Sequence, residues 1–546
     1  MIHRLVLIIS KKLSTWREVA PCADGRALFA LVVATVLLAS CAVPQATVYR
    51  PVPKLLTGGT SDVDLHRMLT RAIDPEDAEA DRMLGRFVEE WHQRRLGSER
   101  VLKPGQPGGL ALVVHLSGSN SCYPVEYFDT LEAVSDLKVA RIPRHRREGV
   151  GAPMVALREN LRQEPIEHYY PPEAITRSVT AFAIAGPIRN GERTVEIRLH
   201  CPLSNDTVDT PAGPQPLAAD FSAPWAALLA RTGDFRLRGF LDAVTPRPSR
   251  PPRLYLMQAY DPEKEPLIMI HGLYGTPLIW AKLSNELWAD PDVRNRYQIW
   301  HYYYNTSAPA LYSARLLREQ LREVRQLLDP TGRNPAMQRT TLLAHSMGGL
   351  ISKALVVRPG DAYWKAAFVV PHDTLKLSPA DRASLHEAFE WEPVRSVHRI
   401  IYMSVPHRGS DYADNLVGQI GRRLTDPPQS FRSFYERISQ ANPGVFTPAY
   451  EELGRGRLNS VSSLSPSQPT LQILADLPYA HPVKIHSIIG TRGRRGPLEE
   501  SSDGIVPYTS SHLPDPDSEL LVPSNHWSYN HPDSITEIKR ILKERP

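Results

Sequence analysis

The chain has few cysteines and lacks the short motifs by which many metal- and nucleotide-binding proteins are recognised. Its 546 residues include four cysteines, and no two of them form a C-x-x-C pair: Cys22, Cys41, Cys122 and Cys201. The H-E-x-x-H, P-loop and EF-hand patterns are also missing. The sequence therefore predicts no metal ion and no cofactor.

Net charge is low, and long hydrophobic runs are almost absent. The formal charge is +5 and 42% of the residues are hydrophobic. So dilute a charge argues against nucleic acid as a partner, and this composition is typical of a globular protein rather than a disordered or multi-span membrane chain. Proline is in excess, at 50 of the 546 residues, which predicts long loops and a linker.

One apolar run stands near the N-terminus. Residues 27–43 (ALFALVVATVLLASCAV) have the length of a signal-peptide apolar region and are marginal for a membrane span. The run contains Leu-Ala-Ser-Cys41, which resembles the lipobox of bacterial lipoproteins. The resemblance implies a signal peptide over residues 1–40, a lipid such as palmitate on Cys41, and a place in the bacterial cell envelope, at the outer membrane facing the periplasm. A plain membrane anchor with an incidental cysteine is the alternative.

Two cysteines are left after such processing. Cys122 and Cys201 both lie at the edges of β-rich segments. Because an oxidising compartment favours paired thiols, we expect a disulfide between them.

The chain divides into five segments, of which the signal peptide over residues 1–40 is the first and residues 254–546 are the last. Residues 41–60 read as a tether, 61–243 as an accessory α+β region, and 244–253, with four prolines, as a linker. The accessory region is expected to be helical over 64–96 and β-rich over four stretches, 110–116, 178–184, 194–201 and 235–241. The role of this region is left open.

Residues 254–546 alternate strand and helix patterns. Apolar strands are expected at 254–260, 266–272, 297–304, 340–346, 398–405, 483–490 and 519–524. This rhythm predicts an α/β fold with a mostly parallel sheet and helices on both faces. Two insertions, 359–397 and 411–480, interrupt it and are expected to form lids or substrate walls.

The segment 344–349 (AHSMGG) closes an apolar strand and opens a helix. That is the context of a nucleophile elbow, G-x-S-x-G with Ala344 in the first glycine position. The sharp turn needs small residues two before and two after Ser346, which Ala344 and Gly348 supply. The alternative is an ordinary helix-capping serine.

Three segments, 271–273 (HGL), 344–349 and 405–410 (VPHRGS), resemble those of bacterial lipases and esterases of the α/β-hydrolase superfamily, with the closest similarity to its inositol-deacylase-like branch. The resemblance covers about residues 254–546. It implies an oxyanion hole formed by the backbone N–H groups of Leu273 and Met347, and the chain order serine, acid, histidine. His271 is expected to be structural.

The acid is expected after the strand at 483–490 and the histidine after the last strand. Asp503 lies in an S-D-G-x-V-P segment similar to the family's acid loop, and Glu499 and Glu500 are weaker candidates. His526 directly follows the strand at 519–524, and His531, next to a proline, is its competitor.

Further charged residues are expected to play no catalytic part. His407 and Arg408 are interpreted as structural or substrate-contacting. The basic clusters Arg141–Arg147 and Arg492–Arg495 are interpreted as solvated loop faces, the second of which lies near enough to Asp503 in sequence to contact an anionic head group.

Together these patterns predict a serine hydrolase of carboxylic esters, working through a Ser346–His526–Asp503 triad and an acyl-enzyme. Three alternatives stay open: an acyltransferase, a serine peptidase on the same fold, and a non-catalytic envelope protein on a hydrolase scaffold. The natural ester and the oligomeric state are not predicted.

Overall fold

A computed structural model describes residues 47–49, 60–118, 124–140, 142–232, 251–411, 429–452, 462–493 and 496–545. The predicted signal peptide, Cys41, Cys122, the strand expected at 235–241 and most of the predicted tether and linker lie outside these ranges. Within them, no helix combines the length and apolar character needed to cross a bilayer.

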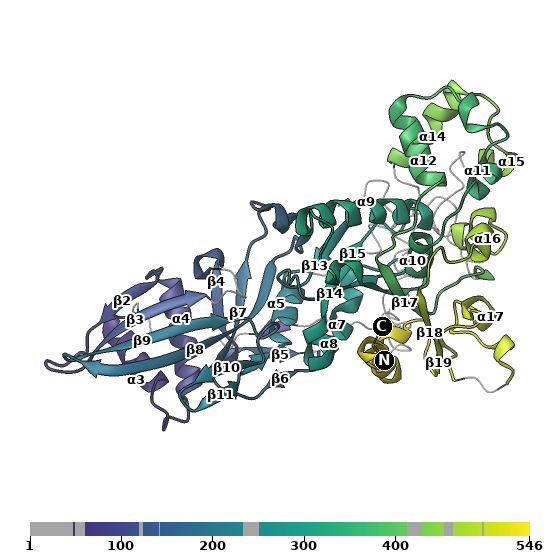
Figure 1. The fold of residues 1–546 in the computed structure, drawn as a ribbon. Coiled ribbons are helices and arrows are strands. Elements are labelled where there is room, and N and C mark those ends of the chain that lie inside the picture. The colour runs from purple at the N-terminus through teal and green to yellow at the C-terminus, as the bar shows by residue number, and fades with distance from the viewer. Residues whose placement is uncertain are drawn as a thin grey trace, which may run out of the picture. The chain divides into compact units, whose positions relative to one another are not determined.

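The accessory region is built on a six-stranded sheet (Figure 1). Its strand order is β2-β3-β9-β8-β7-β4, with bounds β2 Glu99–Leu102, β3 Ala111–Gly118, β4 Thr130–Ala133, β7 Ala152–Arg158, β8 Ile175–Arg189 and β9 Glu192–His200. The predicted β segments at 110–116, 178–184 and 194–201 are thus confirmed. Short strands pair beside the sheet: β1 (Thr47–Tyr49) with β5 (Lys138–Ala140), β6 (Arg146–Arg147) with β12 (Ala219–Asp220), and β10 (Thr207–Thr210) with β11 (Gly213–Pro216). β1 lies inside the segment predicted as tether.

Helices cover both faces of this sheet at β7, because this strand buries apolar side chains on both of its faces. In β7, Met154 and Ala156 pack in one apolar cluster with helices α3 (Asp62–Ala72) and α4 (Ala80–Gln93). The alternate residues Val155 and Leu157 pack in another with α5 (Ala223–Arg231). The alternation of the strand therefore places α3 and α4 on one face and α5 on the other.

The second sheet has seven strands in the order β13-β15-β14-β16-β17-β18-β19, of which only β13 runs antiparallel. Their bounds are β13 Arg253–Leu256, β14 Glu265–Ile270, β15 Tyr297–Tyr303, β16 Thr340–His345, β17 Val397–Met403, β18 Lys484–Gly490 and β19 Ser518–Val522. This arrangement, with helices between the strands, is the α/β-hydrolase fold that the sequence predicts.

Helices lie on both faces of this sheet. Trp300 and Tyr302 of β15 pack in the apolar core with α9 (Ala310–Leu328) and α10 (Met347–Val356). His301, between them, instead shares a hydrogen bond with Ser284 of α7 (Ala281–Ala289). α7 in turn contacts α8 (Pro291–Arg296) and the C-terminal helix α18 (Pro532–Lys543).

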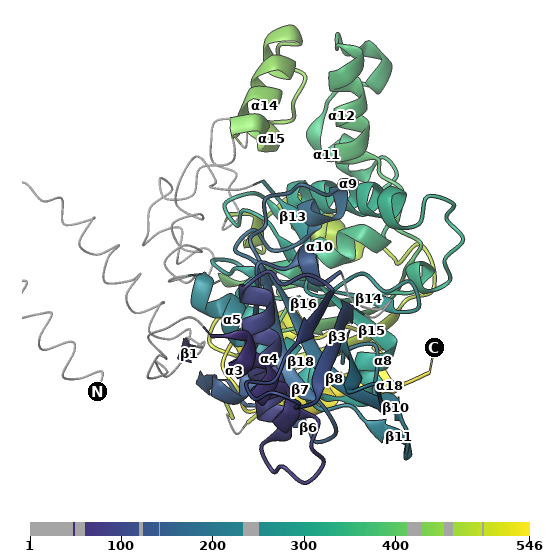
Figure 2. The same ribbon diagram turned by 90° about the vertical axis from the view of Figure 1, so that its left-hand side faces the viewer.

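The two insertions are helical and meet each other. The first holds α11 (Ala362–Ala367) and α12 (Pro379–Phe389), and the second holds α14 (Gln429–Ala441), α15 (Pro448–Glu452) and α16 (Pro469–Asp476). In both ribbon views α11, α12, α14 and α15 gather beyond α9 (Figures 1 and 2). Phe368 and Leu385 share an apolar cluster with Ile438 and Phe446, so segments some 60 residues apart enclose a common core.

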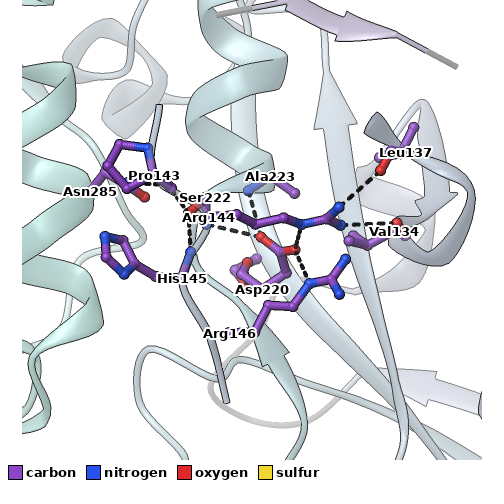
Figure 3. A network of polar contacts seen from close by, with 11 residues as sticks. Val134, Leu137, Pro143, Arg144, His145, Arg146, Asp220, Ser222, Ala223 and Asn285 are labelled. Atoms are coloured by element: carbon purple, nitrogen blue, oxygen red, sulfur yellow. Dashed lines mark hydrogen bonds and ion pairs between the residues drawn. The ribbon is translucent and has the colours of Figure 1, made fainter. Parts of the chain in front are cut away.

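In the cluster Arg141–Arg147, interpreted as a solvated face, Arg144, Arg146 and Arg147 make ion pairs with Asp220 and Asp206; Arg146 is still 48% exposed, and Arg141 lies outside the described residues. Figure 3 shows Arg144 and Arg146 converging on Asp220, whose side chain is only 1% exposed, with contacts of 2.8 and 3.2 Å. Asp220 also accepts from the backbone N–H groups of Ser222 and Ala223. The charges of this loop neutralise a buried carboxylate, which no local sequence pattern reveals.

The same loop makes polar contacts between the accessory region and α7, a helix beside the seven-stranded sheet. Asn285 of α7 donates to the carbonyl of Pro143 at 2.9 Å, and His145 lies 3.2 Å from Glu286 (Figure 3 shows the first contact). Nearby, the rings of Trp225 in α5 and Trp288 in α7 pack 4.8 Å apart. The accessory region therefore shares buried polar and aromatic contacts with α7.

Candidate active site

The predicted site residues follow the carboxyl ends of three parallel strands. Ser346 follows β16, Asp503 lies in the loop after β18, and His526 lies in the loop after β19. Because carboxyl ends of parallel strands share one edge of a sheet, the three residues lie on the same edge, where open α/β sheets bind ligands.

Ser346 adopts a backbone conformation that side-chain-bearing residues rarely take. Its φ is 54° and its ψ is −127°, at the junction of β16 and α10. Its N–H donates to the carbonyl of Met403 in the neighbouring strand at 3.0 Å, which holds the turn in place. An ordinary capping serine needs no such strain, so this observation favours a nucleophile elbow.

The elbow is crowded by neighbouring backbone. A Cβ atom on Gly348 would lie 2.5 Å from the carbonyl oxygen of Ile270, and one on Gly272 would lie 2.8 Å from Cβ of Ser346. Glycine is therefore required at both positions, as the motif predicts for Gly348. The loop that begins at Gly272 touches Ser346 directly.

Asp503 and His526 form a buried hydrogen-bonded pair. His526 Nδ1 lies 2.7 Å from Asp503 Oδ2, and the two residues are 6% and 2% exposed. Since a carboxylate only accepts, Nδ1 of His526 donates to Asp503. Burial alone would raise the pKa of Asp503, but the charge and hydrogen bond of His526 and the N–H groups of Val506 and Ile505 lower the pKa overall.

The competing candidates lie in other surroundings. His531 is the N-cap of α18, where its ring accepts from the backbone N–H of Asp533 at 3.3 Å. Glu499 and Glu500 are exposed in a short 3-10 turn, Leu498–Glu500. The structure thus pairs Asp503 with His526 and leaves these three residues to structural or surface positions.

Ser346 is linked to this pair through its chain neighbour. His345 Nε2 lies 2.7 Å from the carbonyl oxygen of His526, and the two rings pack 4.7 Å apart. Among the described side chains no hydrogen bond joins Ser346 to His526 itself, and such bonds often tighten only when a substrate binds.

The two predicted oxyanion donors lie next to the elbow. Met347 follows Ser346 as the first residue of α10, where helix N–H groups lack partners within the helix. Leu273 follows Gly272, which touches Ser346. Both N–H groups therefore belong to backbone segments that lie next to Ser346.

Two further side chains support the site: Tyr529, which no sequence pattern marks, and His271, which the sequence analysis expects to be structural. Tyr529 packs against Trp280 at 5.3 Å and against His345 at 4.9 Å. His271 is fully buried, stacks on Tyr304 at 4.4 Å, and has its pKa lowered by burial to about 4. These groups fix the loops around Ser346 by packing between distant segments.

The remaining predicted residues support the site from outside it. His407 is buried, and desolvation lowers its pKa well below the usual value. Arg408 donates to the carbonyls of Thr509 and His512, which ties the loop after β17 to the segment after Asp503. Of the second basic cluster, Arg492 has a φ of 55° and its side chain approaches Gly504, while Arg494 and Arg495 lie outside the described residues.

Among the described residues no group of three or more His, Cys, Asp or Glu side chains could hold a metal ion. The side chains at this edge are a serine, an imidazole and a carboxylate, which suit proton transfer and nucleophilic attack.

The chain matches no protein-family model and no curated protein. Solved structures with which it shares similarity include the mature lipase BlEst2 of Bacillus licheniformis, at 17% identity and a TM-score of 0.31 over 52% of this chain and 94% of that one. EstA of Clostridium botulinum matches at 13% identity and a TM-score of 0.31, over 51% of this chain and 87% of that one. A carboxylesterase of the thaumarchaeon Nitrososphaera gargenis matches at 15% identity and a TM-score of 0.26, over 54% of this chain and 96% of that one. Such low values transfer no activity to this chain, so its chemistry is argued from its own residues.

Proposed function

We propose that the protein is a serine hydrolase of carboxylic esters with Ser346, His526 and Asp503 as its triad. The observation that carries the proposal is the buried 2.7 Å contact between His526 and Asp503 on the sheet edge that also holds the strained Ser346. With Nδ1 donating to Asp503, the lone pair of the neutral imidazole lies on Nε2, where a general base requires it.

The proposed reaction uses these groups in turn. His526 Nε2 takes the hydroxyl proton of Ser346 as its oxygen attacks the ester carbonyl, and the backbone N–H groups of Met347 and Leu273 stabilise the oxyanion. When the tetrahedral intermediate collapses, the alcohol leaves with the proton from His526, and an acyl-serine remains. Water then attacks the acyl-serine with His526 as base, His526 returns that proton to the oxygen of Ser346, and the carboxylic acid departs. Asp503 keeps the imidazole in the required tautomer and stabilises its protonated form.

Labelling of the serine tests the proposal. The full chain should react with a fluorophosphonate probe and hydrolyse p-nitrophenyl acetate, while Ser346→Ala should lose labelling and about 10³-fold or more of kcat. Ser352→Ala is the matched control, because this serine lies on α10 and its hydroxyl donates to the carbonyl of Gly348. Labelling that persists in Ser346→Ala, or an unlabelled wild type, would favour the non-catalytic alternative.

The same preparation separates the other two alternatives. An acyltransferase would convert the acyl-serine faster with an added alcohol than with water, which product analysis measures. A peptidase would cleave anilides at rates comparable with the matching esters. Ester hydrolysis without either behaviour supports the proposed function.

The proposal places the enzyme in a bacterial envelope through a lipid on Cys41. Its support is the apolar run 27–43 that contains Leu-Ala-Ser-Cys41. Two acyl chains suffice for stable anchoring, since each buried CH₂ contributes about 0.8 kcal/mol. Cys41→Ser should release the protein from the membrane fraction, and mass spectrometry of the wild type should find lipidated Cys41 as its first residue. An unmodified Cys41 would instead support a plain membrane anchor.

A further inference from the structure

Helices of the two insertions, α12, α14 and α16 among them, line an apolar cavity of about 280 Å³ together with α9 and α10. Most of its wall is aromatic or aliphatic, and the main contributors are Leu385, Phe389, Phe434, Phe446, Leu471 and Leu474. An apolar lining of this kind favours apolar molecules.

The cavity is lined in part by α10, the helix that Ser346 precedes, although none of the proposed triad or oxyanion residues is in its wall. Leu350, in its wall, lies one helical turn after Ser346, or about 6 Å along the axis of α10. Ala310, also in the wall, begins the helix that follows the carboxyl end of β15. Ser463 adjoins Leu464, whose carbonyl accepts from the N–H of Ser410 just after β17. Three separate segments thus place the cavity beside the proposed nucleophile.

The charged groups in the wall are already neutralised. Arg315 pairs with Glu319, and Arg437 lies 2.8 Å from Asp381. With both arginines engaged, the cavity offers a neutral, apolar lining and no free cation for an anionic head group. Its chemistry suits a hydrocarbon chain.

We infer that this cavity holds the hydrocarbon chain of the ester's acyl group, so that the enzyme selects medium-length acyl esters. The inference rests on the proposed function. An apolar cavity of about 150 Å³ takes one benzene ring, so 280 Å³ corresponds to roughly twelve carbon atoms. Each methylene that leaves water should raise kcat/KM about fourfold, until the cavity is full near dodecanoate.

Helix α12 offers a matched pair of substitutions to test this. Ala388 lines the cavity, whereas Ala383 is exposed on the same helix. Ala388→Trp should lower kcat/KM for p-nitrophenyl dodecanoate about tenfold or more and leave p-nitrophenyl acetate within about twofold, because only the long chain loses its space. Ala383→Trp should change neither. Ser384→Phe, which also faces the cavity, repeats the test if the tryptophan variant does not fold.

The outcomes separate this inference from the proposed function. An unchanged chain-length profile in both cavity variants, or equal losses on acetate and dodecanoate, would overturn the acyl cavity while acetate hydrolysis by Ser346 stands. A wild type that hydrolyses no ester would overturn the proposed function. In that case binding of dodecanoate to the wild type, and its loss in Ala388→Trp, would still report on the cavity.

Discussion

His345 donates from Nε2 to the carbonyl oxygen of His526 across 2.7 Å, with both residues buried. The residue before the proposed nucleophile therefore holds the loop that carries the proposed base. Because the two lie 181 positions apart in the chain, this bond joins the elbow to the last loop of the sheet.

Removing this bond should slow the enzyme without weakening substrate binding. His345→Phe loses the donor and lets the His526 loop move, so kcat should fall about tenfold or more with KM little changed. His345→Gln places an amide N–H near the position of Nε2 and should recover most of the loss. Steady-state kinetics on a short ester measure both. Equal defects in the two variants would indicate a packing role alone.

The choice between His526 and His531 can be decided by paired substitutions. His526→Ala should lower kcat about 10³-fold, because the imidazole bonded to Asp503 is the proposed base. His531→Ala should leave kcat within about twofold and cost about 1 kcal/mol of stability, since it removes a helix cap. Kinetics and urea unfolding of both variants measure these effects. Inactivation by His531→Ala alone would reverse the assignment.

Buried neutral histidines should make the protein acid-sensitive. Burial lowers the pKa of His345 and His301 to about 3 and that of His271 to about 4. Below the unfolded pKa of about 6.5, the unfolded chain binds more protons than the folded protein. The free energy of unfolding therefore decreases as the pH decreases, by up to about 1.4 kcal/mol per pH unit for each histidine, until the folded pKa is reached.

Unfolding by urea between pH 8 and pH 5 measures this slope. His345→Gln should reduce it, whereas His386→Gln should not, because His386 is two-thirds exposed at 66%. An identical slope in wild type and His345→Gln would show that His345 is already charged in the folded protein.

Asp220 should be needed for stability rather than for the reaction itself. Asp220→Ala leaves Arg144 and Arg146 without their carboxylate and two backbone N–H groups without an acceptor (Figure 3). Since Arg144 stays a quarter exposed, at 25%, we expect a loss of about 2 kcal/mol, less than for a fully buried pair. Asp209→Ala, at an exposed position, is the control. Urea unfolding that does not distinguish the two would contradict this role.

The predicted disulfide can be tested on exported protein. β3 and β9 run parallel with Gly118 opposite Leu199, so Gly118, the last described residue before Cys122, lies at the same end of the sheet as Leu199, two residues before Cys201. Cys201 is buried, and Cys122 lies outside the described residues. We expect a Cys122–Cys201 peptide in the non-reduced digest, with Cα atoms about 4.4–6.8 Å apart. Alkylation of both thiols before reduction would disprove the pairing.

The local sequence patterns predict the α/β fold, the candidate nucleophile and the candidate acid, and they leave two histidines for the base. The apolar runs that became β14, β16, β17 and β18 lie on contiguous residues, and continuous apolar runs are typical of buried parallel strands. The elbow at Ser346 is likewise a local pattern of small residues. The order serine, acid, histidine is what the resemblance to the α/β-hydrolases implies, and the succession of strands then points to the loops that carry the acid and the histidine.

Only the tertiary structure decided which charged and polar groups meet. Both His526 and His531 follow the last strand, and only packing shows that the first reaches Asp503 while the second caps a helix. Arg144 finds Asp220 across 76 positions, and the cavity needs two insertions that are separate in sequence. Contacts of this range depend on how the sheets and helices close around one another, and no local periodicity encodes that closure.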